Sequence, residues 1–284
     1  MVNLNFKDSP VIIVDMPEPT DFSLQIVSDL HLEYRKTLPD IVPSAPYLAL
    51  CGDIGHPKKP LFRQLLNELS PKFKQIFLIA GNHEYYNKKL SYDKINTIMS
   101  RIAMSYPNVS FLNNMSTDVG NYRILGTTLW TKIPDELADY VTKQMNDYRS
   151  IMYYDKTTHS HKPITVGHTN KWNNENVVWL KHELAQAKLD DKKVIVLSHH
   201  APIANNTIAP KFEHDRLNVA YVNNLNELLT EPIVLWAYGH THYATNFDVN
   251  GVKIVSNPLG YPAQTCGFNT SLVIDVTSVI NSSS

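Results

Sequence analysis

The sequence contains few cysteines and no long hydrophobic run. Only Cys51 and Cys266 are present among 284 residues, which is too few for a disulfide framework and favours a reducing compartment. No apolar stretch approaches the length that spans a bilayer. Residues 1–8 also lack the charged start and apolar core of a secretory signal. We therefore expect a cytoplasmic protein without a membrane partner.

The sequence also lacks an excess of charge of either sign. It has 26 basic and 27 acidic residues, for a net charge of -1, and no run of lysine or arginine longer than a pair such as Lys58-Lys59. Nucleic-acid-binding proteins usually carry a strongly basic face, so nucleic acid is a less favoured partner, although a balanced total is compatible with a local basic patch. Hydrophobic residues make up 43% and charged residues 19%, which is ordinary for a globular protein of one large domain.

Histidine is abundant, with 12 copies, and several copies follow short apolar runs. Such runs are typical of strands that are buried on both faces. Ligands in open α/β sheets bind at the carboxyl ends of strands, so strands that end in polar clusters predict one shared site in an α/β fold. The polar clusters are Ser28-Asp29-Leu30-His31, Cys51-Gly52-Asp53, Gly81-Asn82-His83-Glu84, Ser198-His199-His200 and Gly239-His240-Thr241-His242.

These clusters contain side chains that commonly bind metal ions. Carboxylates, an amide and imidazoles together suit manganese, iron, zinc or cobalt, whereas calcium prefers an all-oxygen site. Seven ligands are too many for one tetrahedral site, but they suit two ions about 3.5–4 Å apart that share a carboxylate and clamp a phosphoryl group. The candidate ligands are Asp29, His31, Asp53, Asn82, His199, His240 and His242.

The order of the clusters resembles the calcineurin-like metallophosphoesterase family. That family has the signature D-x-H, G-D, G-N-H-[DE], H and G-H-x-H, and all five blocks occur here in order over about residues 23–265. The resemblance implies a four-layer α/β/β/α sandwich with two mixed sheets. It also implies two divalent or trivalent metal ions (manganese, iron or zinc) and hydrolysis of a phosphoester by a metal-bridging hydroxide.

The resemblance also implies a role for each residue. His83 would contact the phosphate rather than bind metal, and it would either protonate the leaving group or stabilise the transition state. Apart from the resemblance, we expect Glu84 to act outside the ligand set, where carboxylates often orient metal-bound imidazoles. Either His199 or His200 could be the ligand, and the H-H-P and H-S-P patterns of the family favour His199. One ion would take Asp29, His31 and His242, the other would take Asn82, His199 and His240, and Asp53 would bridge them.

Three further residues are candidates for substrate binding. His56 follows the Asp53 loop, but a solvated loop histidine is an equal alternative. Tyr85, with Tyr86, could form a pocket wall or pack in the core. Arg149 could bind a phosphate through two hydrogen bonds or form a surface ion pair. Arg149 lies in residues 131–172, the least regular part of the sequence, which we expect to form a cap or lid within a single domain over residues 1–284.

The predicted activity is hydrolysis of a phosphodiester or phosphomonoester in a small-molecule substrate. The segment after Asp53 is Ile54-Gly55-His56-Pro57, which differs from the V-D-R-G segment of the phosphoprotein phosphatases. A nuclease of the same superfamily is the enzymatic alternative, although no long DNA-binding extension is present. A non-catalytic scaffold is the other alternative, and the complete ligand set argues against it. The sequence makes no prediction of the oligomeric state or the native metal.

Periodicity and turn signals predict the remaining elements. Helical spacing indicates helices over 60–69, 92–104, 173–189 and 219–229. Asn250-Gly251 predicts a hairpin over 245–255, and Gly120-Asn121 predicts a strand pair over 120–130. A final strand is expected over 271–276, before a serine-rich tail.

Overall fold

The computed structural model describes residues 22–281, so residues 1–21 and 282–284 of the predicted domain, including the end of the serine-rich tail, lie outside it. Two mixed sheets dominate the described part of the chain. The first has five strands in the order β13 (Val273–Asp275), β1 (Ser23–Val27), β2 (Tyr47–Cys51), β3 (Gln75–Ile79) and β4 (Val109–Phe111). The second has six strands in the order β11 (Thr245–Val249), β12 (Val252–Ser256), β10 (Ile233–Tyr238), β9 (Lys193–Ser198), β6 (Tyr122–Thr127) and β5 (Met115–Val119).

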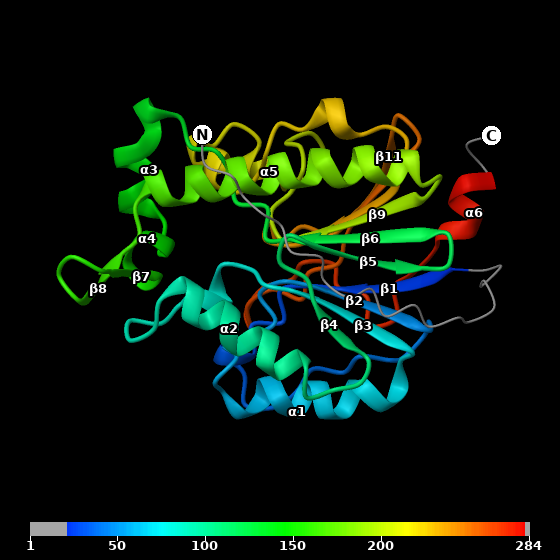
Figure 1. Cartoon of the computed structure of the whole chain (residues 1–284), viewed down its shortest axis with the longest axis horizontal. Coiled ribbons are helices and arrows are strands. Elements are labelled where there is room, and N and C mark those ends of the chain that lie inside the picture. The colour runs from blue at the N-terminus through cyan, green and yellow to red at the C-terminus, as the bar shows by residue number, and fades with distance from the viewer. Residues whose placement is uncertain (1–21, 282–284) are drawn as a thin grey trace.

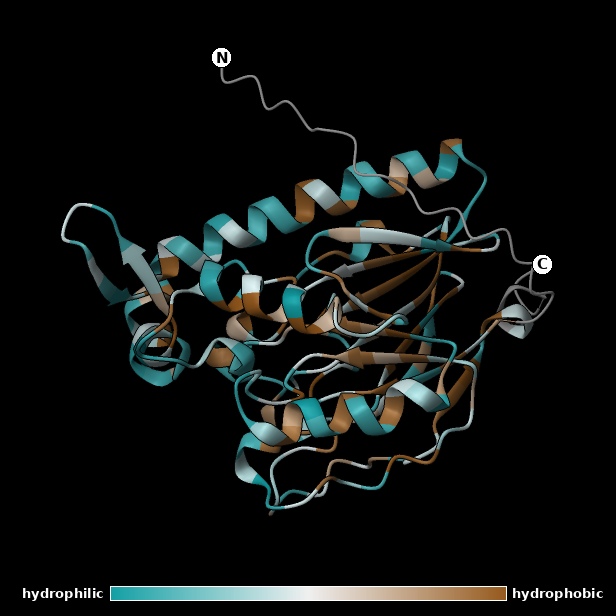
Figure 2. Cartoon of the chain, turned by 60° about the horizontal axis from the view of Figure 1, so that its bottom comes forward, coloured by the Kyte–Doolittle hydropathy of each residue, from teal (hydrophilic) through white to brown (hydrophobic). Residues whose placement is uncertain are grey.

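The two sheets pack face to face over a hydrophobic core. Ile26 and Phe77 of the first sheet meet Ile195 and Leu235 of the second in one buried cluster. These strands are apolar on their outer faces too, because helices cover those faces. Figure 2 shows the hydrophobic residues concentrated on the strands between the layers.

Helices cover the outer face of each sheet (Figure 1). Helices α1 (Pro60–Leu69) and α2 (Tyr92–Ala103) pack on the first sheet, and α5 (Val166–Leu189) packs on the second. Buried side chains of α1 recur at helical spacing, at Phe62, Leu65, Leu66 and Leu69. Each such side chain stabilises the fold by about 1.5–3 kcal/mol relative to its exposed state. The predicted α/β fold with two mixed sheets flanked by helices is confirmed.

The predicted helix over 219–229 is wrong. That segment contains only the end of one 3-10 helix, Arg216–Ala220, and a second short one, Asn226–Leu228. Between them, Val222 forms an extended bridge with Ala201, and the Asn223 side chain donates to Leu129 O and accepts from Asn173 Nδ2. These tertiary hydrogen bonds hold the backbone extended where the periodicity alone favours a helix.

The other predicted helices occur, two of them with altered ends. The first covers 60–69 as predicted, and the second ends at Ala103. Helix α5 begins at Val166 instead of residue 173, because Thr165 and His168 form a capping box that starts it earlier.

Both predicted turns occur. Asn250 and Gly251 have φ values of 51° and 82° between β11 and β12, as a type I′ hairpin turn requires. Gly120 lies between β5 and β6, although β5 begins earlier than predicted, at Met115. The last strand is shorter than predicted and runs directly into α6 (Val276–Asn281).

Residues 131–172 are more regular than the sequence indicates. They contain α3 (Ala138–Gln144), α4 (Asp147–Ser150) and a hairpin of β7 (Met152–Asp155) with β8 (Ser160–Pro163). Figure 1 shows these elements grouped at one end of the molecule, beyond the sheets.

Among residues 22–281, none of the helices is both long and apolar enough to cross a membrane.

Candidate metal centre

Five strand ends meet at one edge of the sandwich. Strands β1, β2 and β3 run parallel in the first sheet, and β9 and β10 run parallel in the second. Their carboxyl ends therefore carry the polar clusters to one place. The candidate ligands there are buried, apart from the half-buried His242.

Five of these residues have a left-handed backbone, which non-glycine residues seldom adopt. Such a conformation costs about 1–3 kcal/mol per residue and persists only where the surroundings enforce it. Clustered strain of this kind is typical of functional sites. The φ values are 54° at Asp29, 47° at His31, 52° at Asp53, 69° at His240 and 49° at His242.

Two glycines allow the loops to approach each other closely. A Cβ atom on Gly52, which has a φ of 83°, would collide with the His199 ring. A Cβ atom on Gly81 would collide with the Asp53 carboxylate. The glycines of the G-D and G-N-H blocks therefore make room for the side chains that face them.

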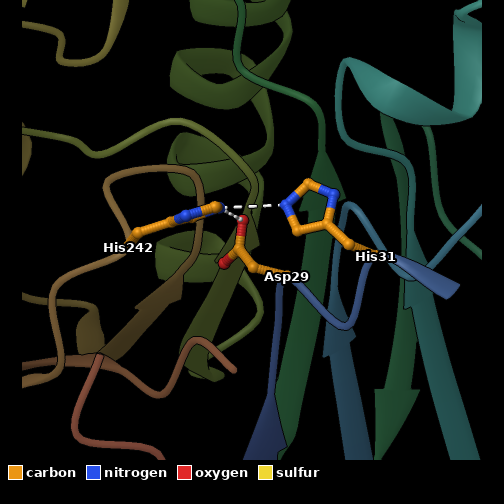
Figure 3. Close-up of side chains that lie close together, drawn as sticks. All are labelled: Asp29, His31 and His242. Carbon is orange, nitrogen blue, oxygen red and sulfur yellow. Dashed lines mark hydrogen bonds and ion pairs between the residues drawn. The ribbon is translucent and has the colours of Figure 1, made fainter. Parts of the chain in front are cut away.

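Asp29, His31 and His242 form the first cluster (Figure 3). His242 Nε2 lies 3.4 Å from Asp29 Oδ1 and 2.9 Å from His31 Nε2. Two imidazole nitrogens and a carboxylate oxygen thus face a common point. Asp29 is held in place by the His240 N–H, which donates to its carboxylate.

Asn82, His199 and His240 lie together on the other side of Asp53. Asn82 Oδ1 is 3.1 Å from His199 Nε2, and Asp53 Oδ1 is 3.4 Å from the same nitrogen. The other Asp53 oxygen, Oδ2, is 3.7 Å from His31 Nε2 in the first cluster. One carboxylate therefore faces both clusters, with a different oxygen toward each.

His199, rather than His200, faces these groups. The Nδ1 atom of His200 lies 3.0 Å from Thr128 O instead, and its ring packs near the rings of His240 and Trp130. Burial, followed by the nearby His199, lowers the pKa of His200 to about 3. His200 is therefore a neutral packing residue behind the site.

Oxygen acceptors outside the clusters orient three of the imidazoles. His31 Nδ1 lies 3.0 Å from Glu33 Oε1, His199 Nδ1 lies 3.0 Å from Cys51 O, and His242 Nδ1 lies 2.6 Å from Gln264 Oε1. Each contact leaves Nε2 of the ring directed into the site. Imidazoles that bind metals in proteins are usually oriented in this way.

The charge and hydrogen bonding of the site suit bound cations. Burial opposes ionisation of Asp53, but the neighbouring His199 and His83 hold its pKa well below the usual range. His240 Nε2 is buried without a hydrogen-bond partner within residues 22–281. A buried polar nitrogen without a partner is costly. Mixed imidazole, carboxylate and amide donors around it fit manganese, iron or zinc.

His83 lies beside the two clusters, at the wall of a cavity. Its backbone N–H donates to Asp53 Oδ1 at 2.8 Å. Its ring nitrogens lie 2.9 Å from Glu33 Oε1 and 3.1 Å from the Tyr261 hydroxyl. Burial opposes its protonation, but Asp53 and Glu33 raise the pKa of His83 to about 9.

Glu84 holds two loops together. Its carboxylate accepts backbone hydrogen bonds from Gly81 N at 2.6 Å, Asp53 N at 3.0 Å, Ile54 N at 2.7 Å and Gly55 N at 3.1 Å. Glu84 lies outside the ligand set as predicted, but within residues 22–281 its hydrogen-bond partners are backbone N–H groups and not an imidazole. It instead positions the backbone that carries Asp53.

A cavity of about 970 Å³ opens above the clusters. Its walls come from Asp53, the loop after β3, and the segments 144–146, 208–221, 240–244 and 261–267. Several aromatic side chains line it, and Lys211 is the one lysine among the lining residues that the structure describes. The aromatic lining residues are Tyr86, Phe212, Tyr221, Tyr243 and Tyr261.

The three predicted substrate contacts are not at this cavity. Tyr85 is fully buried, stacks on Tyr92 and donates to Asn96, so the prediction that it contacts substrate is wrong. Arg149 donates to Lys143 O and Asn146 Oδ1 and does not line the cavity.

His56 does not line the cavity either. Its Nδ1 accepts from Lys58 N, and its Nε2 contacts Asn87 Nδ2 at 3.1 Å. The predictions for Arg149 and His56 are corrected in the same way, because local hydrogen bonds hold both side chains elsewhere.

Three residues that touch the site have no role predicted from the sequence. Glu33 contacts His31 and His83, Tyr261 contacts His83, and Asp147 accepts from Asn82 Nδ2 at 2.8 Å. Glu33 follows His31 by two residues, so the short separation in sequence was a signal from which its contact with His31 could be predicted. The other two residues follow no strand-end pattern, and tertiary folding alone brings them here.

Comparisons with known proteins identify a family and a relative. The family model described as calcineurin-like phosphoesterase matches residues 23–244. Uncharacterized protein L509 of Acanthamoeba polyphaga mimivirus is 34% identical over 282 residues, which cover 90% of this chain and 98% of that protein.

One solved structure shows the same fold with a TM-score above 0.5. The phosphopantetheinyl hydrolase of Mycobacterium tuberculosis aligns with a TM-score of 0.62 and 15% identity, over 86% of this chain and 91% of that one. A dimetal phosphatase of Danio rerio aligns with a TM-score of 0.48 and 13% identity, over 86% and 89% of the two chains. The family match extends over the five strand-end clusters from Asp29 to His242, and the chain belongs to the calcineurin-like phosphoesterase family.

Proposed function

We propose that the protein is a dinuclear metal-dependent phosphoesterase that hydrolyses a small-molecule phosphodiester or phosphomonoester. The two clusters would hold one cation each, drawn from manganese, iron and zinc, and Asp53 would bridge them. The first cation would be held by Asp29, His31 and His242, and the second by Asn82, His199 and His240.

The position of Asp53 is the observation that carries this proposal. Its two oxygens face different imidazoles, His31 and His199, on opposite sides of one carboxylate. A carboxylate that served a single ion would not need histidines at both oxygens. The unpartnered His240 Nε2 supports a second cation on the His199 side.

When bound, such cations supply an activated water and neutralise charge on the phosphoryl oxygens. The protein would supply the rest. His83 Nε2 points to the cavity, where it can hold a proton for the leaving oxygen. The Asp53 carboxylate accepts from the His83 N–H, so the proton donor and the bridging ligand keep a constant spacing.

The cavity supports an organic substrate of moderate size. Its aromatic walls suit a flat or apolar group, whereas Lys211 is the single lysine that lines it in the described residues. A site for a polyanionic strand would carry several cations to pair with phosphates. The small-molecule proposal is therefore favoured over a nuclease.

We also propose that residues 131–172 act as a cap. Met145 and Asn146, which connect α3 and α4, reach the cavity wall. Asp147 bonds to Asn82 directly. This cap would therefore shape the substrate pocket and support one ligand.

A cytoplasmic location stays a prediction from the cysteine content.

The test is hydrolysis of bis-p-nitrophenyl phosphate and p-nitrophenyl phosphate by the full chain, with manganese and after chelation. We expect metal-dependent turnover, two ions per chain by elemental analysis, and loss of both in Asp53→Asn. Exposed Asp139→Asn, in α3, is the control and should behave as the native protein. Native metal content without turnover on a broad phosphoester panel would favour the scaffold alternative. Metal-dependent activity that survives in Asp53→Asn would refute the site assignment.

A further inference from the structure

One carboxylate oxygen contacts two histidines of different function. Glu33 lies in a short 3-10 helix, Leu32–Tyr34, which begins directly after the ligand His31. Its Oε1 is 3.0 Å from His31 Nδ1 and 2.9 Å from His83 Nδ1. The Glu33 side chain is only 15% exposed, so water has little access to these contacts.

The chemistry of this contact determines where both rings carry hydrogen. A carboxylate oxygen accepts hydrogen bonds, so each Nδ1 must donate to it. His31 then presents the lone pair of Nε2 toward Asp53 and His242, as a metal ligand must. His83 presents Nε2 toward the Tyr261 hydroxyl and the cavity.

The backbone that carries Glu33 is firmly attached. His31 N donates to Asp53 O, and Leu32 N donates to Ile54 O. Arg35 donates from Nε to Leu30 O and from Nη2 to Gly260 O, both at 2.6 Å. The carboxylate is therefore held by a fixed turn, as a group that orients other side chains requires.

We propose that Glu33 is a positioning residue that sets the ring orientation and tautomer of the ligand His31 and the proton donor His83 at the same time. This inference rests on the proposed function for the roles of the two histidines. Within residues 22–281, Glu33 is the one hydrogen-bond partner of His83 Nδ1. Without it, that ring could place its hydrogen on either nitrogen.

Two substitutions separate orientation from charge. Glu33→Met keeps the length of the side chain but removes the acceptor, and Glu33→Gln keeps an acceptor oxygen but removes the charge. Loss of an outer partner typically lowers activity or metal affinity about 10–100-fold. We expect that loss in Glu33→Met and substantial recovery in Glu33→Gln. Glu68→Met, on the exposed side of α1, is the matched control and should have no effect.

The choice of leaving group reports on His83 specifically. A nitrophenolate departs without a proton, whereas an alkoxide needs one. Glu33→Met should therefore lower kcat more for an alkyl phosphoester than for a p-nitrophenyl ester. In a His83→Gln background, Glu33→Met should add no further sensitivity to the leaving group, because both changes act through one proton donor.

The decisive readout does not depend on activity. Long-range ¹⁵N–¹H spectra of the histidine rings in the folded, metal-free full chain report which nitrogen carries hydrogen, provided that they are recorded at a pH above the raised pKa of His83, where its ring is neutral. The native protein and Glu33→Gln should show Nδ1–H at His31 and His83, and Glu33→Met should show Nε2–H as well. Circular dichroism would verify that each variant is folded.

Three results would overturn the inference. The first is an unchanged tautomer in folded Glu33→Met. The second is equal damage from Glu33→Gln and Glu33→Met, which would indicate a role for charge alone. The third is a native content of three cations that falls to two in Glu33→Met, since His31, Glu33 and His83 also lie close enough to hold an ion. If the tautomers change as expected but no phosphoester is hydrolysed, the proposed function fails and the orienting role of Glu33 stands.

Discussion

Asp147, in the proposed cap of residues 131–172, accepts a hydrogen bond from Asn82 Nδ2 at 2.8 Å. This contact determines which end of the Asn82 amide faces the site, because Nδ2 points to Asp147 and Oδ1 points to His199. The Tyr86 hydroxyl donates to the same Asp147 oxygen at 2.6 Å. The cap segment therefore orients a proposed metal ligand through one buried carboxylate.

Replacing Asp147 should weaken metal binding. In Asp147→Leu the Asn82 amide loses the acceptor that orients it, and we expect about 10-fold weaker binding at the second cation site, as is usual for outer partners. Manganese titration of the chelated protein by calorimetry measures this change. The exposed Asp139→Leu is the control. Native affinity in folded Asp147→Leu would contradict the prediction.

Gly52→Ala should abolish activity through a steric collision. The alanine Cβ would enter the His199 ring, and the backbone φ of 83° adds strain. Gly251 has a nearly equal φ of 82° but open space around its Cα, so Gly251→Ala isolates the backbone strain, about 1 kcal/mol. We expect both variants to lose stability and only Gly52→Ala to lose metal and turnover. Thermal unfolding and elemental analysis measure the two effects, and full metal content in Gly52→Ala would refute the collision.

Adjacent tyrosines should respond differently to loss of their hydroxyls. Tyr85 donates to Asn96 inside the core, so Tyr85→Phe should lower the free energy of unfolding by about 1 kcal/mol and leave KM unchanged. Tyr86 lines the cavity and bonds to Asp147, so Tyr86→Phe should change kcat/KM. Denaturant unfolding and steady-state kinetics distinguish them. A raised KM in Tyr85→Phe would restore it as a substrate contact.

His200 should make the metal-free protein sensitive to acid. Its pKa is lowered to about 3 in the fold, below the ordinary value of about 6.5 expected when unfolded, so the unfolded state binds the proton first. Stability is thus full above about pH 6.5 and falls as the pH is lowered toward 3, by at most about 1.4 kcal/mol per pH unit.

His200→Gln keeps a donor for Thr128 O and removes the titration. Its free energy of unfolding should fall less steeply than that of the native protein below pH 6.5 in urea titrations at each pH. His182→Gln, exposed on α5, serves as the control. Parallel stability curves for the native protein and His200→Gln would show that His200 does not titrate in this range.

The sequence by itself determined the strands and the identity of the strand-end clusters. Apolar runs such as 24–27 and 194–197 form strands wherever two faces are covered, and a ligand directly after a strand is placed by that strand. The Asn250-Gly251 turn is equally local, because few residue pairs tolerate two left-handed positions. These features depend on neighbours in sequence, so sequence alone suffices to predict them.

Only the tertiary structure decided which side chains support the clusters. Tyr85 and Tyr86 are adjacent and chemically identical, yet one enters the core and the other the cavity, because a 3-10 turn separates their directions. Residues 219–229 form no α-helix because Asn223 bonds to segments distant in sequence. Asp147 reaches Asn82 across 65 positions of the chain. Such contacts depend on how separate elements pack, and the local periodicity of the sequence does not predict that packing.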